Sequence, residues 1–398
     1  MKNAFVHLLR RLYLASSILG VIVAFILTPP LRLLRRCLGT GLNSLWAGTP
    51  ILTLPLNARA ESLLGINAKS LVFESYGIAR GGFDIHLGPW VRIPVVGRLV
   101  PLFTFLYACI TQDRLHFFCD RALLPVHKPF LLNWFELAAY KFLGIQVFFW
   151  VYGADVRTRK VTMQLGQPNC CSFCPAVGSA CTCDTERWRR NHKVISRYAT
   201  GVFSMGDMIH YTPGSRNDVF FWPIDLLADN GAKYSPEYPD VQSKVAVKIV
   251  HAANHRAFKG SDFLVSAVSE LQQQGLAVEL VLVENLPNEI ALGHYRSADI
   301  IFDQCLIGFH GYFALEGMAL GKPVMSFVRF PEQYLLAPNE CPIVNTSLLT
   351  LKQDLAKLCA DRVHLRDLGV SGRRYVEKYF SIEAVSRRMS IAYKALGV

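Results

Sequence analysis

Residues 307–324 read IGFHGYFALEGMALGKPV, and the rest of the chain is interpreted outward from this stretch. Residues 298–304, ADIIFDQ, precede it and predict a short buried strand. About three helical turns are expected after the glycine-containing loop, because Gly321 fits the position just after a helix and Pro323 prevents its continuation. Residues 324–327 are apolar again and predict the next strand. The stretch therefore predicts one β-α-β unit.

The turn of this unit suits a phosphate group. Gly311 lets a ligand approach the backbone, and the N-terminus of the following helix offers free N–H groups and a partial positive charge. Glu316 lies within the first two helical turns, where its carboxylate can accept hydrogen bonds from a sugar hydroxyl. Spacing alone favours a plainer alternative, an ordinary α/β crossover with Glu316 on a solvated face.

Residues 313–324 resemble the donor-site helix of the GT-B glycosyltransferases. The resemblance is to the retaining glycosyltransferase family 4 (glycosyl transferases group 1), which includes many bacterial polysaccharide enzymes. That family usually carries two Glu residues eight positions apart; the second matches Glu316, and the first would fall at Gly308. In the family, the second Glu binds the nucleotide ribose and the first contacts the donor sugar. The resemblance therefore implies a nucleotide site at Glu316.

A basic loop lies at Arg256-x-x-Lys259-Gly260, between a strand predicted at 245–251 and a helix that Ser261 is expected to cap. It resembles the family loop whose Arg and Lys hold the donor diphosphate. Two cations beside a diphosphate stabilise a departing anion, so Arg256 and Lys259 are predicted to bind it together with Gly311. The alternative is a solvated Lys and Arg on the surface.

The first half of the chain alternates apolar runs with helical patterns, which predicts a parallel sheet covered on both faces. Residues 152–157, YGADVR, follow one such strand and resemble a His-Gly-x-Asp segment of the family's N-terminal domain. Tyr152 stands where the family often has its active-site His. Tyr152, Asp155 and Asp120, all at strand ends, are therefore the candidate catalytic residues on the acceptor side. An ion pair between Asp155 and Arg157 is the structural alternative. The predicted strands of this half are 49–56, 70–75, 116–119, 146–152 and 199–204.

Five of the eleven cysteines fall within residues 170–183. Their spacing places four thiolates within short reach, which suits tetrahedral zinc, with an iron–sulfur cluster as the less favoured metal. A disulfide-stapled loop is the second interpretation and free cysteines are the third. Zinc is preferred to disulfides because a nucleotide-sugar enzyme works in the cytosol, where disulfides are rare. The predicted ligands of this structural zinc are Cys171, Cys174, Cys181 and Cys183.

The N-terminus is basic and apolar. No Asp or Glu occurs before Glu61, and residues 1–60 carry seven of the twelve net positive charges of the chain. Residues 12–28 are nearly all apolar and lie between arginines, so they predict a membrane-seated helix, shallow or re-entrant, with one full span as the alternative. A signal peptide and a buried first helix are less favoured. An anionic membrane is a better partner for this charge than nucleic acid.

The sequence therefore predicts an α/β protein of the GT-B class, with two Rossmann-like domains facing a cleft and an N-terminal membrane-associated helix. The resemblance implies transfer of a sugar from a nucleotide diphosphate to a lipid-linked acceptor in cell-surface polysaccharide assembly, with retention and without a catalytic metal, at the cytoplasmic face of the inner (plasma) membrane. The alternatives are a sugar-nucleotide epimerase and a non-catalytic scaffold. The predicted segments are 1–36 at the membrane, 45–228 as acceptor domain with the insertion 170–183, 229–244 as linker, 245–380 as donor domain and 381–398 as the last helix.

Overall fold

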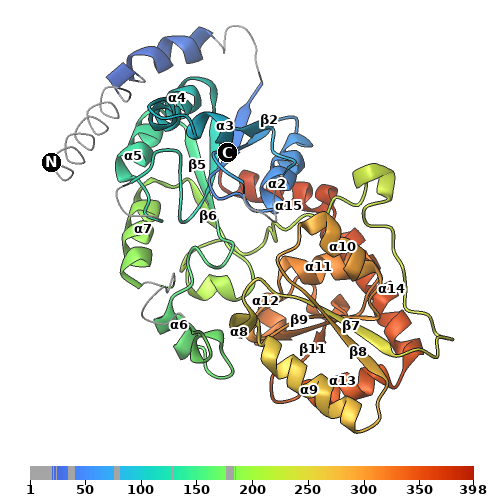
Figure 1. Cartoon of the computed structure of the whole chain (residues 1–398). Helices are drawn as coiled ribbons and strands as arrows, with labels where there is room; N and C mark the ends of the chain where they lie inside the picture. The colour runs from blue at the N-terminus through green and yellow to red at the C-terminus, as the bar shows by residue number, and fades with distance from the viewer. Residues whose placement is uncertain are drawn as a thin grey trace.

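The computed structural model folds into two α/β units, one above the other in Figure 1. It describes residues 20, 22–23, 25–34, 41–75, 81–126, 130–175, 183 and 185–398. The predicted membrane segment 1–36 therefore lies largely outside the described residues. Among the helices that are described, none combines the length and the apolar character needed to cross a bilayer.

The N-terminal unit is built on a six-stranded parallel sheet in the order β3-β2-β1-β4-β5-β6. Its central strands are buried along nearly their whole length, as expected of parallel strands covered on both faces. The strands are β1 Asn43–Ala47, β2 Asn67–Val72, β3 Ile85–His86, β4 Arg114–Phe118, β5 Gln146–Trp150 and β6 Gly201–Phe203. The helices are α2 Thr53–Ser62, α3 Gly88–Val91, α4 Val96–Thr111, α5 Trp134–Phe142, α6 Arg159–Gln164, α7 Thr185–Tyr198, and the 3-10 turns η1 Cys170–Ser172 and η2 Gly206–His210.

The strand predicted at residues 49–56 is wrong. β1 ends at Ala47, and Gly48, with φ 114°, turns the chain away beneath the backbone of Arg121. The apolar run that follows is the buried first part of α2, whose later residues, NARAE, favour a helix. A short apolar run does not by itself distinguish a buried strand from the buried face of a helix.

The C-terminal unit is a five-stranded parallel sheet, with strands at the five places that the sequence predicts. Their order in the sheet is β11-β10-β9-β7-β8. Its first strand begins at Val247, so the predicted linker 229–244 falls between the two sheets. The strands are β7 Val247–Ala252, β8 Val278–Val283, β9 Ile300–Gly308, β10 Val324–Val328 and β11 Val344–Asn345. The helices are α8 Arg256–Lys259, α9 Ser261–Gln273, α10 Asn288–Arg296, α11 Tyr312–Ala319, α12 Pro331–Tyr334, α13 Leu351–Cys359, α14 Arg362–Tyr379 and α15 Ile382–Ala395, with 3-10 turns η3 Ala228–Gly231 and η4 Pro338–Glu340.

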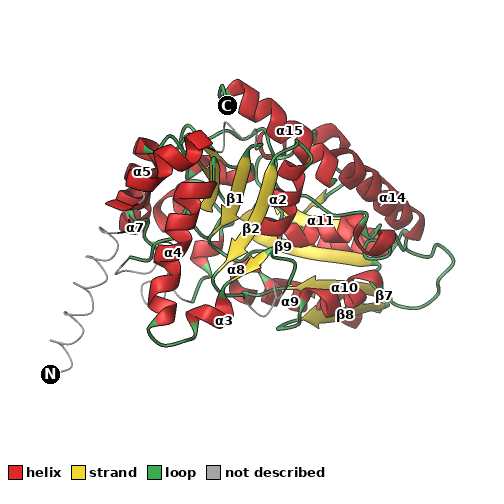
Figure 2. Cartoon of the chain, turned by 90° about the horizontal axis from the view of Figure 1, so that it is seen from above, coloured by secondary structure: helices red, strands yellow, loops and turns green. Residues whose placement is uncertain are grey.

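The last helix, α15, packs back on the N-terminal unit. Figures 1 and 2 both place it beside α2. The Arg114 guanidinium of β4 lies 4.7 Å from the centre of the Tyr393 ring, and Ile224 donates a backbone hydrogen bond to Phe380 just before the helix begins. The chain therefore crosses between the two sheets twice, and this ties them together.

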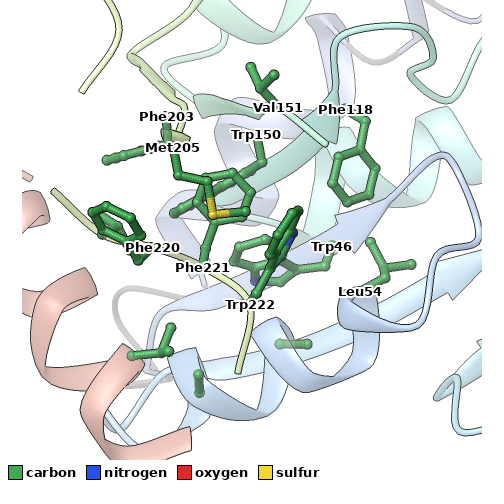
Figure 3. Close-up of a cluster of buried hydrophobic side chains, with 14 of the residues drawn as sticks. Trp46, Leu54, Phe118, Trp150, Val151, Phe203, Met205, Phe220, Phe221 and Trp222 are labelled. Atoms are coloured by element: carbon green, nitrogen blue, oxygen red, sulfur yellow. The ribbon is translucent and has the colours of Figure 1, made fainter. Parts of the chain in front are cut away.

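Aromatic side chains fill the core of the N-terminal unit where it meets residues 220–222, the segment that leads to the C-terminal unit (Figure 3). Trp150 stacks on Phe203 at 4.2 Å and meets Phe221 edge-on at 4.8 Å. The buried indoles are satisfied, because Trp46 donates to Glu61 at 2.7 Å and Trp150 donates to His116 at 3.0 Å. This packing fixes the C-terminal ends of β1, β4 and β5 side by side at one edge of the sheet.

Candidate active site

A cavity of about 420 Å³ lies between the two units, and Glu316 is part of its wall. Arg59 and other side chains of α2 line it from the N-terminal unit, and Asn288 and Tyr234 line it beside Glu316. One carboxylate oxygen of Glu316 accepts hydrogen bonds from Asn288 Nδ2 at 2.9 Å and from Tyr234 Oη at 3.2 Å. The second turn of α11 thus places a buried carboxylate at the cleft, where the sequence predicts the ribose.

Burial raises the pKa of Glu316 to about 7, although the hydrogen bonds from Asn288 and Tyr234 favour its ionised form. The carboxylate therefore titrates near neutral pH. In its ionised form it is an acceptor only, which is the form that binds two ribose hydroxyls. The ribose role stays a prediction.

Lys259 and Gly311 share one partner, Asp303. Lys259 Nζ lies 2.9 Å from Asp303 Oδ1, and the backbone N–H of Gly311 donates to Asp303 Oδ2 at 2.6 Å. Asp303 is fully buried within β9 and also accepts from Ser326 Oγ at 3.1 Å. Burial raises its pKa, but Lys259 outweighs this, so that the pKa of Asp303 lies below its ordinary value. One aspartate therefore assembles two residues that the sequence analysis predicted separately.

The sequence analysis missed Asp303, although a signal was present. It is the one charged residue inside β9, whose other residues are apolar except for Gln304, and a buried charge needs a partner. Lys259 retains donor capacity, since an ammonium has three N–H groups, and within the described chain two of them find acceptors, Asp303 and, at 3.5 Å, Ala252 O. The remaining N–H can serve a diphosphate.

Arg256 has a different environment. It forms ion pairs with Asp262 at 3.2 Å and Glu284 at 3.5 Å, and its side chain is 44% exposed. Ser261 is not the predicted helix cap, because Gly260, with φ 82°, holds that position. The hydroxyl of Ser261 instead lies 2.7 Å from His251 Nε2 in the core. The structure therefore places Lys259 at the buried site and Arg256 among surface carboxylates.

The three candidate residues of the acceptor side lie together at the ends of β4 and β5. Tyr152 Oη donates to Asp120 Oδ2 at 3.0 Å, and Asp120 Oδ1 accepts from Thr49 Oγ1 at 2.8 Å. Asp155 accepts three backbone N–H groups, from Cys119 at 3.1 Å, Tyr152 at 3.2 Å and Gly153 at 2.9 Å. Asp155 therefore holds the turn, while Asp120 contacts only hydroxyl groups in these interactions.

The ionisation of this group follows from burial. Burial, and then the charge of Asp120, raise the pKa of Asp155 to about 7. The same two causes raise the pKa of Tyr152 well above its ordinary range, so Tyr152 is a hydrogen-bond donor rather than a base. The alternative ion pair of Asp155 with Arg157 is wrong, because Arg157 pairs with Asp207 at 2.6 Å.

The cysteine segment reaches the C-terminal unit. Cys170 and Cys171 lie in the same hydrophobic cluster as β7 and α9, and Phe173 meets Phe263 edge-on at 5.1 Å. Cys171, Cys174 and Cys183 form no disulfide within the described chain, and Cys181 lies outside the described residues. Within the described ranges, no group of three or more side chains is arranged to hold a metal ion. Hydrogen bonds from the thiols of Cys170 and then Cys183 lower the pKa of Cys171.

No family model matches this chain, and no curated protein matches it. Solved structures do. Sucrose-phosphate synthase from Thermosynechococcus elongatus matches with a TM-score of 0.56 at 14% identity, covering 90% of this chain and 99% of that one. HepE of Anabaena, solved with UDP-glucose, matches with a TM-score of 0.55 at 12% identity, covering 89% of this chain and 99% of that one. A candidate UDP-N-acetylglucosamine 2-epimerase from Listeria monocytogenes matches with a TM-score of 0.50 at 12% identity, covering 89% of this chain and 96% of that one.

This chain has the GT-B fold. The predicted fold class is confirmed in its two parallel α/β sheets. Lys259, Asp303, Gly311 and Glu316 belong to the second unit of this fold, and Asp120, Tyr152 and Asp155 belong to the first. The two sets occupy the C-terminal edges of their sheets, where open α/β sheets bind ligands.

Proposed function

We propose that this protein is a glycosyltransferase that moves a sugar from a nucleotide-diphosphate donor to an acceptor held by the N-terminal unit. The observation that carries the proposal is the joint placement of Lys259 and Gly311 by the buried Asp303, on the strand that leads to the Glu316 helix. A cation, a glycine and a buried carboxylate in this order suit a diphosphate and a ribose. The shared fold with HepE, which was solved with UDP-glucose, supports this assignment.

On the donor side, Lys259 neutralises the charge that grows on the departing diphosphate. The N-terminus of α11, which begins directly after Gly311, receives the phosphate oxygens. Glu316 accepts hydrogen bonds from the ribose hydroxyls. The resemblance to the retaining glycosyltransferase family 4 supports retention of configuration without an essential metal.

On the acceptor side, Asp120 is the better candidate for contact with the acceptor hydroxyl. Its partners Thr49 and Tyr152 are hydroxyl groups, which rearrange easily, whereas three backbone N–H groups occupy the carboxylate of Asp155. Tyr152 orients Asp120 and does not act as a base. Asp155 keeps the turn in place.

Calorimetry with UDP, GDP, dTDP and ADP, followed by turnover of the matching nucleotide sugars, tests the proposal. We expect micromolar to millimolar binding of one nucleoside diphosphate. A folded protein that binds none of them contradicts the proposal and favours the scaffold alternative. Conversion of a free nucleotide sugar without any acceptor favours the epimerase alternative, which the similarity to the Listeria protein supports.

We propose further that the acceptor is lipid-linked, that it serves cell-surface polysaccharide assembly, and that the protein works at the cytoplasmic face of the inner membrane. An exposed apolar face on α3 and α4 supports this. Residues 85–112 contain two arginines and no acidic residue. Trp90 is 58% exposed and Phe103 is 63% exposed. The other members of this apolar face are Ile93, Val95, Val96, Leu99 and Tyr107.

The described part of the N-terminal helix lies on the same side of the N-terminal unit, beside α4 and α5 (Figure 1). Phe25 packs edge-on against Phe142 of α5 at 4.6 Å, and Arg32 forms an ion pair with Asp113 at 2.9 Å. Figure 1 shows this helix beside α4 and α5, at the far end from the C-terminal unit. Exposed apolar side chains with neighbouring arginines suit an anionic lipid surface.

Vesicle flotation tests the membrane proposal. We expect the protein to float with vesicles containing anionic lipid, and the Phe103→Glu variant to float several-fold less. Ile391→Glu is the matched control, because Ile391 is equally exposed, at 63%, but lies on α15. Equal loss in both variants, or no loss in either, contradicts an apolar docking face on α4.

A structural zinc ion bound by Cys171, Cys174, Cys181 and Cys183 completes the proposal. The hydrogen bond between the thiols of Cys171 and Cys183 supports a zinc site, because it brings the two ends of the cysteine segment together. Elemental analysis of purified protein should find about one equivalent of zinc, and chelation should lower the melting temperature. Absence of zinc and iron, with these thiols titratable in the native protein, contradicts it.

A further inference from the structure

At the end of β9, where the resemblance places an acidic side chain, the space is filled by Arg329, which follows β10. The first Glu of the family pair would fall at Gly308, which is buried and has φ 99°. A Cβ atom at this position would lie 3.2 Å from Nε and 3.5 Å from Nη2 of Arg329. The guanidinium of Arg329 therefore fills the space that a side chain at residue 308 would enter.

Arg329 is held firmly in this place. Its backbone N–H donates to Gly308 O at 3.0 Å, and its guanidinium lies 5.2 Å from the ring of Phe327. Nη2 donates to Pro168 O of the N-terminal unit at 2.6 Å. Nε is buried and has no hydrogen-bond partner within the described chain. One edge of this cation is thus unsatisfied, next to the contact that Arg329 makes with the N-terminal unit.

Two more buried polar atoms near Arg329 lack a partner among the described residues. Tyr334 is fully buried, and its hydroxyl has no partner among the described residues. Its ring lies 5.6 Å from His210, whose Nε2 is likewise buried and unpartnered in the part of the chain that is described. Asp207, a carboxylate of the same group, is occupied by Arg157 at 2.6 Å and 3.2 Å. Arg329 Nε and the Tyr334 hydroxyl are thus donors without an acceptor in the described chain, and an anionic oxygen is the acceptor that best suits a guanidinium.

We propose that Arg329, with Tyr334 and His210, binds the carboxylate of an acidic donor sugar, so that the substrate is a nucleotide-diphosphate uronic acid. This inference rests on the proposed function, which places the diphosphate at Lys259 and Gly311. Gly308 lies three residues before Gly311 on the same loop, which favours the donor sugar over the acceptor as the source of the carboxylate. A guanidinium binds a carboxylate through two parallel N–H groups. A neutral sugar leaves the buried Nε of this half-buried cation without an anionic partner, and this disfavours it.

The test is calorimetry with a matched neutral and uronic pair, UDP-glucose and UDP-glucuronate, or the equivalent pair on the base that the protein binds as a diphosphate. We expect the uronic donor to bind about 10- to 100-fold more tightly than the neutral donor. Arg329→Met should abolish this preference while nucleoside diphosphate affinity stays unchanged. Arg366→Met is the control, since Arg366 also lies over an aromatic ring, that of Tyr238 at 5.6 Å, and should keep the preference.

Tyr334→Phe gives a second test that keeps the charge and removes only an unpartnered hydroxyl. It should reduce the preference several-fold without lowering the melting temperature. If the wild-type protein binds a nucleoside diphosphate but binds both sugars equally, the inference is overturned and the proposed function stands. If it binds no nucleoside diphosphate, the proposed function itself fails, and the assignment of Arg329 to a donor sugar fails with it.

Discussion

The two strand edges that face each other across the cleft hold their charges in different ways. In the C-terminal unit, Lys259 and Glu316 are each held by side chains, Asp303 in one case and Asn288 with Tyr234 in the other. In the N-terminal unit, the carboxylate of Asp155 is saturated by backbone N–H groups. A carboxylate surrounded by backbone donors stabilises a turn. A charged group that is held by side chains and still has an unused donor or acceptor can bind a ligand.

The largest effect is expected for Lys259→Met. It removes the cation that stabilises the departing diphosphate and leaves the buried Asp303 unpaired. We expect turnover to fall by roughly 100- to 1000-fold and the protein to lose about 3 kcal/mol of unfolding free energy. The double variant with Asp303→Asn should regain stability but not turnover. Normal turnover in the single variant would contradict a diphosphate site at Lys259.

A pair of isosteric substitutions distinguishes the catalytic role proposed for Asp120 from the structural role of Asp155. Asp120→Asn keeps both contacts, because hydroxyl groups donate or accept as needed, so stability should persist while turnover falls about 100-fold. Asp155→Asn places an amide N–H against the N–H of Cys119 or of its neighbours, which should cost about 2 kcal/mol of stability. Urea unfolding and turnover on both proteins measure the two effects. Equal behaviour of the two variants would remove the distinction between them.

Glu316→Gln should weaken nucleoside diphosphate binding about 10- to 100-fold at pH 8. Because the pKa of Glu316 is about 7, binding by the parent protein should tighten as the pH rises from 6 to 8, and the variant should lose this dependence. The folded protein keeps a proton that the unfolded chain releases above its ordinary pKa of 4.5. The contribution of Glu316 to stability therefore declines between pH 4.5 and 7, and the variant should show a flatter stability profile. A pH-independent affinity in the parent protein would contradict this role.

The smallest effect is expected for Arg256→Met. Its two ion pairs are largely exposed, so the loss should be within about 0.5 kcal/mol in stability and less than about threefold in donor affinity. Calorimetry of donor binding to the Arg256→Met and Lys259→Met variants, measured side by side, compares the two losses of affinity. A loss as large as that of Lys259→Met would show that Arg256 turns from its surface partners to the diphosphate when the donor binds.

Much of the donor unit was predictable because its signals are local. Gly321 has φ 75° directly after α11, as its position before Lys322 and Pro323 predicts. The strand–helix alternation also predicts both parallel sheets. Residues 49–56 and Ser261 were predicted wrongly, since a short apolar run and a serine beside a helix each fit two local structures, and only packing selects one.

By itself, the sequence determined the order of strands and helices, the glycine turn before Glu316 and the basic character of the first 60 residues. Only the tertiary structure decided which residues are partners. Asp303 joins Lys259 across 44 positions, Arg329 contacts Pro168 across 161, and the cysteine segment packs on the opposite unit. The physical reason is that local patterns follow from backbone periodicity, whereas partners of buried charges are set by which strand ends lie adjacent in space.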